Sequence, residues 1–320
     1  MATPAWISLG SNLGDRAATL DAALAALAET PGVAVRAVST YHETAPVGGP
    51  DGQGTFLNAA AHLETTLGPF ELLDALQAIE ARFGRVRAVR WGERTLDLDL
   101  LIFGTKFLDT RRLKVPHTRL ALRRFVLAPL AEIAPYVIDV VSRRSIGDLL
   151  ANLDRRPRWI ALDGPPGRRK EAVFRLLVAD LPAIPIEGAE DDLEPVEDRP
   201  TTHRQVHSID RKLDLLGSMR PESHPVEPSW HLADFDLRSD LIRSVIDVGP
   251  AGWQSREVTA RLRDAVKASP APTFAVILPG PKDLARKPWL GGPPRLWPES
   301  DKPEAIVAEV LATCRGIEGP

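Results

Sequence analysis

The most informative segment of the sequence is Thr95-Leu96-Asp97-Leu98-Asp99-Leu100-Leu101-Ile102, which has the pattern of a strand. Side chains alternate between the two faces of a β-strand, so Asp97 and Asp99 share one face and the neighbouring leucines share the other, which faces a core. Two adjacent carboxylates repel each other unless a cation joins them, and hard oxygen ligands of this kind suit Mg²⁺ with bound phosphates. The alternative is an ordinary amphipathic strand with one face in water.

The segment directly before this strand is rich in arginine. Four arginines fall within ten residues, namely Arg85, Arg87, Arg90 and Arg94. A guanidinium can donate two parallel hydrogen bonds to a phosphate, so arginines beside paired acids predict a site that binds a magnesium polyphosphate. The alternative is a solvated basic loop that pairs with nearby acids. Surface ion pairs contribute only ~0–1 kcal/mol each and give little reason for such a density of charge.

The rest of the first half alternates between strand and helix patterns. Apolar residues at helical spacing predict helices over 13–27 and 69–83. Pro31-Gly32 and Gly84 are the stop signals that follow them. Strand-like composition marks residues 5–9, 33–44, 56–67 and 95–103. The resulting order β-α-β-β-α-β predicts an α+β, ferredoxin-like sandwich for this half.

Composition divides the chain near residue 157. The length of 320 residues corresponds to about two domains, and the hydrophobic content of 44% provides for sizeable cores. Nine of the 29 prolines precede residue 158, and the net charge is +1 before that residue and −4 from it onward. A basic stretch that contains proline, Asp154–Arg158, lies at the change. We therefore predict domains over 1–157 and 158–320.

Charge, cysteine content and hydropathy exclude several classes of protein. With 40 basic and 43 acidic residues, the chain lacks the positive excess of a general nucleic-acid or membrane-surface binder. Its one cysteine, Cys314, excludes a disulfide framework and a multi-cysteine zinc site. No apolar run approaches the ~20 residues that span a bilayer, and Met1–Leu13 lacks the features of a signal peptide. We expect a cytoplasmic protein that binds neither nucleic acid nor a membrane.

Six motifs of the first half follow one another in an order that matches a known family. They cover Leu9–Gly14, Tyr41–Gly48, Phe56–Ala60, Arg90–Asp99, Val115–His117 and Arg123–Phe125. Over residues 1–157 the chain resembles the 6-hydroxymethyl-7,8-dihydropterin pyrophosphokinases of folate synthesis. The resemblance implies an enzyme that transfers the β,γ-pyrophosphoryl group of ATP to the hydroxymethyl oxygen of the pterin and releases AMP.

The resemblance assigns roles to the charged residues of this half. Asp97 and Asp99 would bind two Mg²⁺ ions, in agreement with the pattern of their strand. Arg85 and Arg94 would bind phosphate and stabilise the transition state. No residue is an obvious general base, and positioning with charge stabilisation can suffice for this chemistry. The positions expected near ATP are Gln77, Glu80, Arg87, Arg90, Arg112, His117 and Arg123.

The pterin is flat, aromatic and edged with hydrogen-bond donors and acceptors, so its site needs stacking surfaces and a few polar groups. Phe56 and Phe125 match the stacking pair of the family, and Asn58 can offer the pterin edge both a donor and an acceptor. Trp91 lies on a loop that we expect to close over the substrates. Without the resemblance, the two phenylalanines would be assigned to the core and Trp91 to packing. Further contacts are expected from the backbone of Thr44, Ala45, Pro46 and Val47.

The first half departs from the family pattern in a few places. Glu93 stands where proline is common, and Arg124 replaces the usual glycine before Phe125. The arginine-rich loop is one residue shorter than in some members, so Arg87 and Arg90 could exchange roles. None of these departures removes a metal ligand or an aromatic residue, and we therefore expect activity.

The second half opens with the pattern of a strand, a loop and a helix. Trp159–Glu171 resembles the phosphate-binding loop G-x-x-x-x-G-K-[ST], with Gly164 and Lys170 in register. Arg169 replaces the second glycine, and Glu171 replaces the hydroxyl residue. A side chain at the glycine position crowds the amides that cradle phosphates, and a carboxylate repels them. We therefore expect that this half does not transfer phosphate.

Another stretch of this half, Trp230–Ser239, is similar to a segment of bacterial deoxynucleoside kinases. The resemblance implies a degenerate α/β, P-loop-kinase-like domain with a parallel sheet, and a homodimer through this half. The arginine-rich lid of such kinases is thin here, with Lys282, Arg286 and Lys287 as candidates. The alternative is an unrelated α/β interaction domain.

Other functions remain open at this point. One is a bifunctional enzyme that also phosphorylates deoxynucleosides. Another is a non-catalytic module that binds a nucleotide or a pterin, although such a module has less need of Asp97 and Asp99. An RNA-binding ferredoxin-like domain would require exposed aromatic residues and a basic excess, whereas the first half carries a net charge of only +1.

Overall fold

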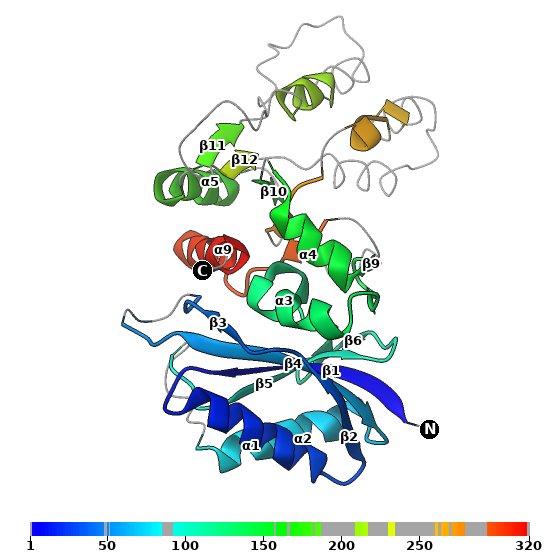
Figure 1. The fold of residues 1–320 in the computed structure, drawn as a ribbon. Coiled ribbons are helices and arrows are strands. Elements are labelled where there is room, and N and C mark those ends of the chain that lie inside the picture. The colour runs from blue at the N-terminus through cyan, green and yellow to red at the C-terminus, as the bar shows by residue number, and fades with distance from the viewer. Residues whose placement is uncertain are drawn as a thin grey trace, which may run out of the picture. The chain divides into compact units, whose positions relative to one another are not determined.

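The structure, a computed structural model, describes these residues: 2–47, 50, 52–84, 92–156, 158–164, 167–181, 183–186, 209–216, 230–233, 260–261, 264–268, 271–278 and 293–318. They form two compact units, drawn in Figure 1. The first unit contains the described residues up to Asp154 and those from Ala312 onward, and the second contains those between Arg155 and Leu311. The end of the chain therefore belongs to the first unit, whereas the sequence predicted a second domain that runs to residue 320.

The first unit has a mixed α and β architecture. The segments expected over 5–103 occur as helices or strands, with bounds that shift by a few residues. In chain order the elements are β1 (Thr3–Ser11), α1 (Arg16–Ala28), β2 (Val33–Val38), β3 (His42–Thr44), β4 (Phe56–Thr65), α2 (Pro69–Arg82), β5 (Asp97–Phe103), β6 (Leu108–Asp109), β7 (Lys114–Val115), a 3₁₀ turn (Leu120–Leu122), α3 (Arg124–Ile133), β8 (Ile138–Asp139), β9 (Arg144–Ser145) and α4 (Ile146–Asp154).

The sheet of this unit is antiparallel, with the order β2-β4-β1-β5, and β3 adds to β4. The prediction of one strand over residues 33–44 is wrong, because the chain leaves the strand conformation between Val38 and His42. There the backbone N–H of Thr40 donates to the Glu132 carboxylate of α3 at 2.8 Å, and that carboxylate also lies 2.6 Å from His42 Nε2. These contacts with α3, which lies about 90 residues further along the chain, hold the backbone at the break between β2 and β3.

Helices α1 and α2 cover one face of the sheet, and α3 lies on the other (Figure 1). The face under α1 and α2 supplies the core of the unit. Ile7, Leu9 and Leu63 from the strands and Leu72 and Leu76 from α2 are at most 1% exposed. Burying a side chain of this size contributes about 1.5–3 kcal/mol. The packing of these side chains therefore strongly stabilises the position of β1, β4 and β5 against the helices.

The helices begin and end where local chemistry favours it. The side chain of Asp15 accepts a backbone N–H from the first turn of α1 at 3.0 Å, as an N-cap residue does. Pro69 occupies the first position of α2, where its missing N–H costs nothing. Gly84 follows that helix with φ +74°, a conformation that glycine adopts without a steric penalty. The bounds predicted for α2 therefore agree with the structure to within a residue or two.

The second unit contains a parallel sheet, as expected for this half. Its described strands take the order β11-β12-β10-β13-β14. Trp159, Trp230 and Phe274 are at most 2% exposed and give the unit a core of its own. The elements are β10 (Arg158–Asp163), α5 (Arg168–Asp180), β11 (Ala183–Ile186), β12 (Trp230–Ala233), β13 (Phe274–Ile277), β14 (Arg295–Leu296) and α9 (Pro303–Glu318), whose last residues belong to the first unit.

Truncation of Leu76 tests the core beneath the sheet. Leu76→Ala removes most of a fully buried side chain and leaves a cavity, so the free energy of unfolding should fall by about 2–5 kcal/mol. Urea unfolding of the full chain, followed by circular dichroism, measures the change. Ile138 on β8 is 50% exposed, and Ile138→Ala should cost less than about 0.5 kcal/mol. Equal losses in the two variants would contradict the packing described here.

Candidate active site

Strand β5 presents Asp97 and Asp99 on the face of the sheet opposite α1 and α2. Asp97 pairs with Gly10 and Asp99 pairs with Ser8 on β1. Leu98, which alternates with the two acids, is 4% exposed and packs in the core. A slip of one residue would drive both carboxylates into that core, so the register of β5 is strongly specified. The Asp97 and Asp99 side chains remain 20% and 34% exposed, which leaves them accessible to a ligand.

Protein groups cover the outer edge of β5, the last strand of its sheet. The Glu80 carboxylate of α2 accepts the backbone N–H of Leu98 at 2.7 Å, and the backbone N–H of His117 donates to the Leu101 carbonyl at 2.8 Å. Unpaired backbone groups at a buried edge are costly, so these contacts hold the strand that carries the acids. Glu80, a predicted ATP residue, is 3% exposed and contacts this strand.

Three basic side chains converge on the two acids. Arg94 Nη1 donates to Asp97 Oδ2 at 2.6 Å. From the other side, Arg123 Nη1 lies 3.6 Å and His117 Nε2 lies 4.0 Å from Asp99 Oδ2. Arg94 precedes β5, whereas the other two follow β7, so the fold assembles the group from separate segments. Carboxylates that can hold a cation, next to guanidiniums that can bind phosphate oxygens, suit a polyphosphate.

The imidazole of His117 is neutral in this setting. Desolvation by the surrounding protein is the largest cause, and the adjacent guanidiniums of Arg123 and Arg119 add to it; together they lower the pKa of His117 from 6.5 to about 3. The backbone N–H of Arg119 donates to His117 Nδ1 at 3.2 Å. The neutral ring therefore carries its proton on Nε2, the nitrogen that faces Asp99. Such a group can donate a hydrogen bond to an oxygen without adding positive charge.

The motif Leu9–Gly14 contains a positioning residue, Asn12, to which the sequence patterns assigned no role. Asn12 Oδ1 accepts the backbone N–H of Arg94 at 2.7 Å, and the backbone N–H of Asn12 donates to the Arg94 carbonyl at 3.1 Å. Asn12 is 5% exposed. It thus fixes the backbone of the arginine that bonds Asp97. The only signal for this role was the presence of a polar residue directly after a strand, within a family motif.

Residues predicted to bind the pterin share a face with the acids. Asn58 and Asp97 lie on either side of Gly10 on neighbouring strands, so their side chains point the same way. Asn58 Nδ2 donates to Thr44 Oγ1 at 2.8 Å. A Cβ at Gly10 would lie 3.1 Å from Asn58 Oδ1 and 3.8 Å from the Phe56 ring. Glycine at this position therefore leaves room for both predicted pterin residues.

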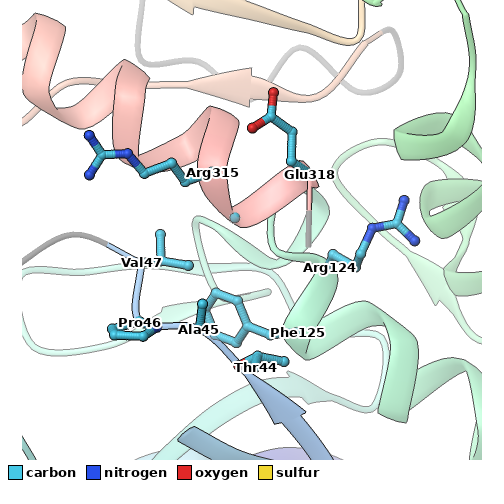
Figure 2. A pocket seen from close by; sticks show the side chains of 9 residues that line it. Thr44, Ala45, Pro46, Val47, Arg124, Phe125, Arg315 and Glu318 are labelled. Atoms are coloured by element: carbon cyan, nitrogen blue, oxygen red, sulfur yellow. The ribbon is translucent and has the colours of Figure 1, made fainter. Parts of the chain in front are cut away.

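A cavity of about 200 Å³ is lined by Thr44, the hydrogen-bond partner of Asn58, as Figure 2 shows. Thr44–Val47 and Phe125, all predicted pterin residues, line it together with Arg124. The remaining lining residues come from the end of α9, which belongs to the same compact unit: Arg315, Gly316 and Glu318. No sequence pattern indicated this part of the wall, because the three residues follow the other lining residues by 190 or more positions along the chain.

Some predicted residues have other surroundings. Arg112 pairs with Asp74 of α2 and lies with its Cζ 5.8 Å from the centre of the Phe70 ring, so its guanidinium contacts α2. Gln77 is exposed on the same helix. The residues of the arginine-rich loop lie outside the part of the chain that the structure describes: Arg85, Arg87, Arg90 and Trp91.

Asp97 and Asp99 fit a magnesium site completed by a substrate. Within the described ranges, no three Asp, Glu, His or Cys side chains form a metal-binding group. Mg²⁺ usually keeps several waters and is held by one or two carboxylates together with substrate phosphates. Two acids on one face, next to the guanidiniums of Arg94 and Arg123, meet that requirement.

The neutral His117 makes a pH-dependent contribution to stability. The unfolded chain takes up a proton here below pH 6.5, whereas the folded protein does so only near pH 3, so acidification within this window favours unfolding. The free energy of unfolding of the wild type, minus that of His117→Gln, should fall by up to about 1.4 kcal/mol per pH unit between about pH 6.5 and 4.5. Urea unfolding without Mg²⁺ measures both proteins. A difference that does not change with pH would contradict a neutral ring.

Comparison with known proteins places this site in a family. Residues 6–135 match the family model of 7,8-dihydro-6-hydroxymethylpterin-pyrophosphokinase (HPPK). The chain is 52% identical over 133 residues to a 2-amino-4-hydroxy-6-hydroxymethyldihydropteridine pyrophosphokinase of Bacillus subtilis, which covers 42% of this chain and 79% of the relative. It is 50% identical over 146 residues to the enzyme of that name from Pseudomonas aeruginosa, which covers 46% and 89%.

A solved structure is also similar, that of Plasmodium falciparum HPPK-DHPS with pteroate. It aligns with 88% of this chain and 72% of its own length, at 13% identity and a TM-score of 0.38. The relatives match over most of their length and the match includes every element that carries Asp97, Asp99, Asn58 and Phe125. On that ground the chain belongs to the HPPK family.

Proposed function

We propose that this chain transfers the β,γ-pyrophosphoryl group of ATP to 6-hydroxymethyl-7,8-dihydropterin, in folate biosynthesis, with AMP and the pterin diphosphate as products. The observation that carries the proposal is the convergence of Arg94, Arg123 and His117 on the two acids of β5, beside the cavity at Phe125. A module that only binds a nucleotide or a pterin has little need of the two adjacent carboxylates, Asp97 and Asp99. Membership of the HPPK family supports the enzyme.

The phosphate side of the site follows from these charges. Two Mg²⁺ ions, when bound at Asp97 and Asp99, would neutralise charge that develops on the phosphates during in-line transfer. Arg94 and Arg123 would bind phosphate oxygens, and the neutral His117 would donate from Nε2. Arg85 is assigned to the transition state. ATP contacts are proposed for Gln77, Glu80, Arg87, Arg90 and Arg112.

The pterin side lies directly next to the phosphate side. Arg123 Cζ lies 5.5 Å from the centre of the Phe125 ring, so one guanidinium contacts both the stacking residue and the acid Asp99. Transfer between two substrates requires this proximity, because the reacting atoms must approach to about 3–3.5 Å. Phe56 and Phe125 would stack on the pterin, Trp91 would close over it, and Asn58 would read its edge.

For the fold of the first unit we propose the ferredoxin-like class. The strand order β2-β4-β1-β5 and the antiparallel pairing support the assignment. The location of α1 and α2 together on one face of the sheet supports it as well.

For the second unit we propose a degenerate P-loop-kinase-like domain without phosphoryl transfer. The parallel order β11-β12-β10-β13-β14 and the positive φ angles of Gly164 and Gly167, after the central strand β10, support a loop of phosphate-binding type. Arg169 in the first turn of α5 lies 3.7 Å from Asp301, and Glu171 in the same turn carries negative charge. The carboxylate of Glu171 repels phosphate there, and Arg169 brings a side chain to the position where the motif has glycine. A bifunctional enzyme is the alternative.

The proposed homodimer rests on the resemblance of the second unit to deoxynucleoside kinases. The helices in the described ranges are too short or too polar to cross a bilayer. We propose a cytoplasmic enzyme whose partners are its small-molecule substrates, with a homodimer formed through the second unit.

The acids of β5 provide the test of the proposed reaction. Asp97→Asn should reduce the pterin-dependent formation of AMP from Mg-ATP at least about 100-fold, because metal binding supplies several kcal/mol of charge stabilisation. Glu64→Gln is the control, since Glu64 pairs with Arg36 at the end of β4 remote from Asn58. Chromatography of nucleotides separates AMP from ADP. Absence of pterin-dependent AMP in folded wild-type protein would refute the proposal.

The proposal that the second unit does not transfer phosphate can be tested with deoxynucleosides. With Mg-ATP and each of the deoxynucleosides, the full chain should form no deoxynucleoside monophosphate, because Arg169 and Glu171 occupy the first turn of α5. Mass spectrometry of the products checks this result. A monophosphate product that disappears in Lys170→Ala would establish the bifunctional alternative instead.

A further inference from the structure

The end of α9 lies outside residues 6–135, which match the HPPK family, yet it lines the cavity proposed for the pterin. Figure 2 shows α9 on one side of this cavity, with Phe125 and the residues that follow β3 on the other. The end of α9 and these residues belong to the same compact unit. The family region alone therefore does not enclose the cavity.

The backbone of α9 packs closely against the pterin side at Gly316. Gly316 is buried. A Cβ there would lie 3.4 Å from Val47 Cγ1 and 3.8 Å from Phe125 Cε1. These are ordinary van der Waals distances, so a methyl group fits, while a longer side chain would compete for the space between α9 and the two residues. The helix therefore forms a wall of the cavity next to a proposed stacking ring.

Arg124 holds this end of the helix in place. Its Nε donates to the Ile317 carbonyl at 2.9 Å, and its guanidinium also pairs with Asp154 at the end of α4. The last carbonyls of a helix lack partners within the helix, and a cation near them is favourable. In the sequence Arg124 directly precedes Phe125, the proposed stacking residue. Arg124 thus supplies a contact that fixes the last turn of α9.

We propose that the last turn of α9 forms part of the pterin-binding wall, so that residues outside the HPPK region determine the affinity for the pterin. This inference rests on the function proposed above. The cavity of about 200 Å³ is smaller than the ~300–1,000 Å³ of typical ligand pockets, so each wall limits the ring system that enters. Arg315 and Glu318 are exposed beside it and offer opposite charges to the donors and acceptors of the pterin edge.

Gly316→Leu tests the wall in the full-length protein. Leucine would occupy space between α9 and Phe125, so the KM for the pterin should rise at least about 10-fold, while the KM for ATP changes less than about two-fold. Pterin binding by calorimetry, with a non-hydrolysable ATP analogue and Mg²⁺ present, should weaken by a similar factor. Ala308→Leu adds the same side chain at an exposed position of α9 and should change neither constant. An unchanged KM for ATP also shows that the variant is folded.

Arg124→Ala is a second variant that adds no bulk. It removes the partner of the Ile317 carbonyl, and the pterin KM and Kd should rise about 3–10-fold. Wild-type pterin affinity in Gly316→Leu, or tighter pterin binding in Arg124→Ala, would overturn the inference and leave the proposed reaction intact. Wild-type protein that binds no pterin would overturn the proposed function, and this inference with it.

Discussion

The alternation of side chains along β5 is the constraint on which the site depends. Leu98 is buried on one face, so Asp97 and Asp99 must stand on the other. The Glu80 carboxylate and the His117 backbone hold the outer edge of the strand and leave it little freedom to shift. Because the carboxylates are fixed in this way, the basic groups that gather around them can form a site for a charged substrate without rearrangement of the sheet.

Those features of the first unit that depend on neighbouring residues could be predicted from the sequence. The period of two in residues 95–100 is visible in a single run, and Pro69 and Gly84 mark the ends of α2 by their own backbone preferences. The break between β2 and β3 could not be predicted in this way. It coincides with hydrogen bonds from Thr40 to Glu132, a residue 92 positions further along the chain. Contacts of that kind leave no local pattern.

The end of the chain shows the same limit on a larger scale. Composition is an average over neighbours, and it placed everything after residue 157 in one domain. It contains no information on the contact between Ile317 and Arg124, which unites the last turn of α9 with the first unit. The sequence alone assigns Arg124 no structural role. In the structure its Nε donates to the Ile317 carbonyl near the C-terminal end of α9.

The transfer of two phosphates as one group is the step that distinguishes this reaction from ordinary phosphoryl transfer. ATP that carries a radioactive label at the β-phosphorus, incubated with the full chain, Mg²⁺ and 6-hydroxymethyl-7,8-dihydropterin, follows that step directly. A site built on Asp97 and Asp99 for pyrophosphoryl transfer predicts that the label leaves with the pterin product and that the AMP is unlabelled. Label retained in ADP would contradict it, since only the γ-phosphate would then have moved.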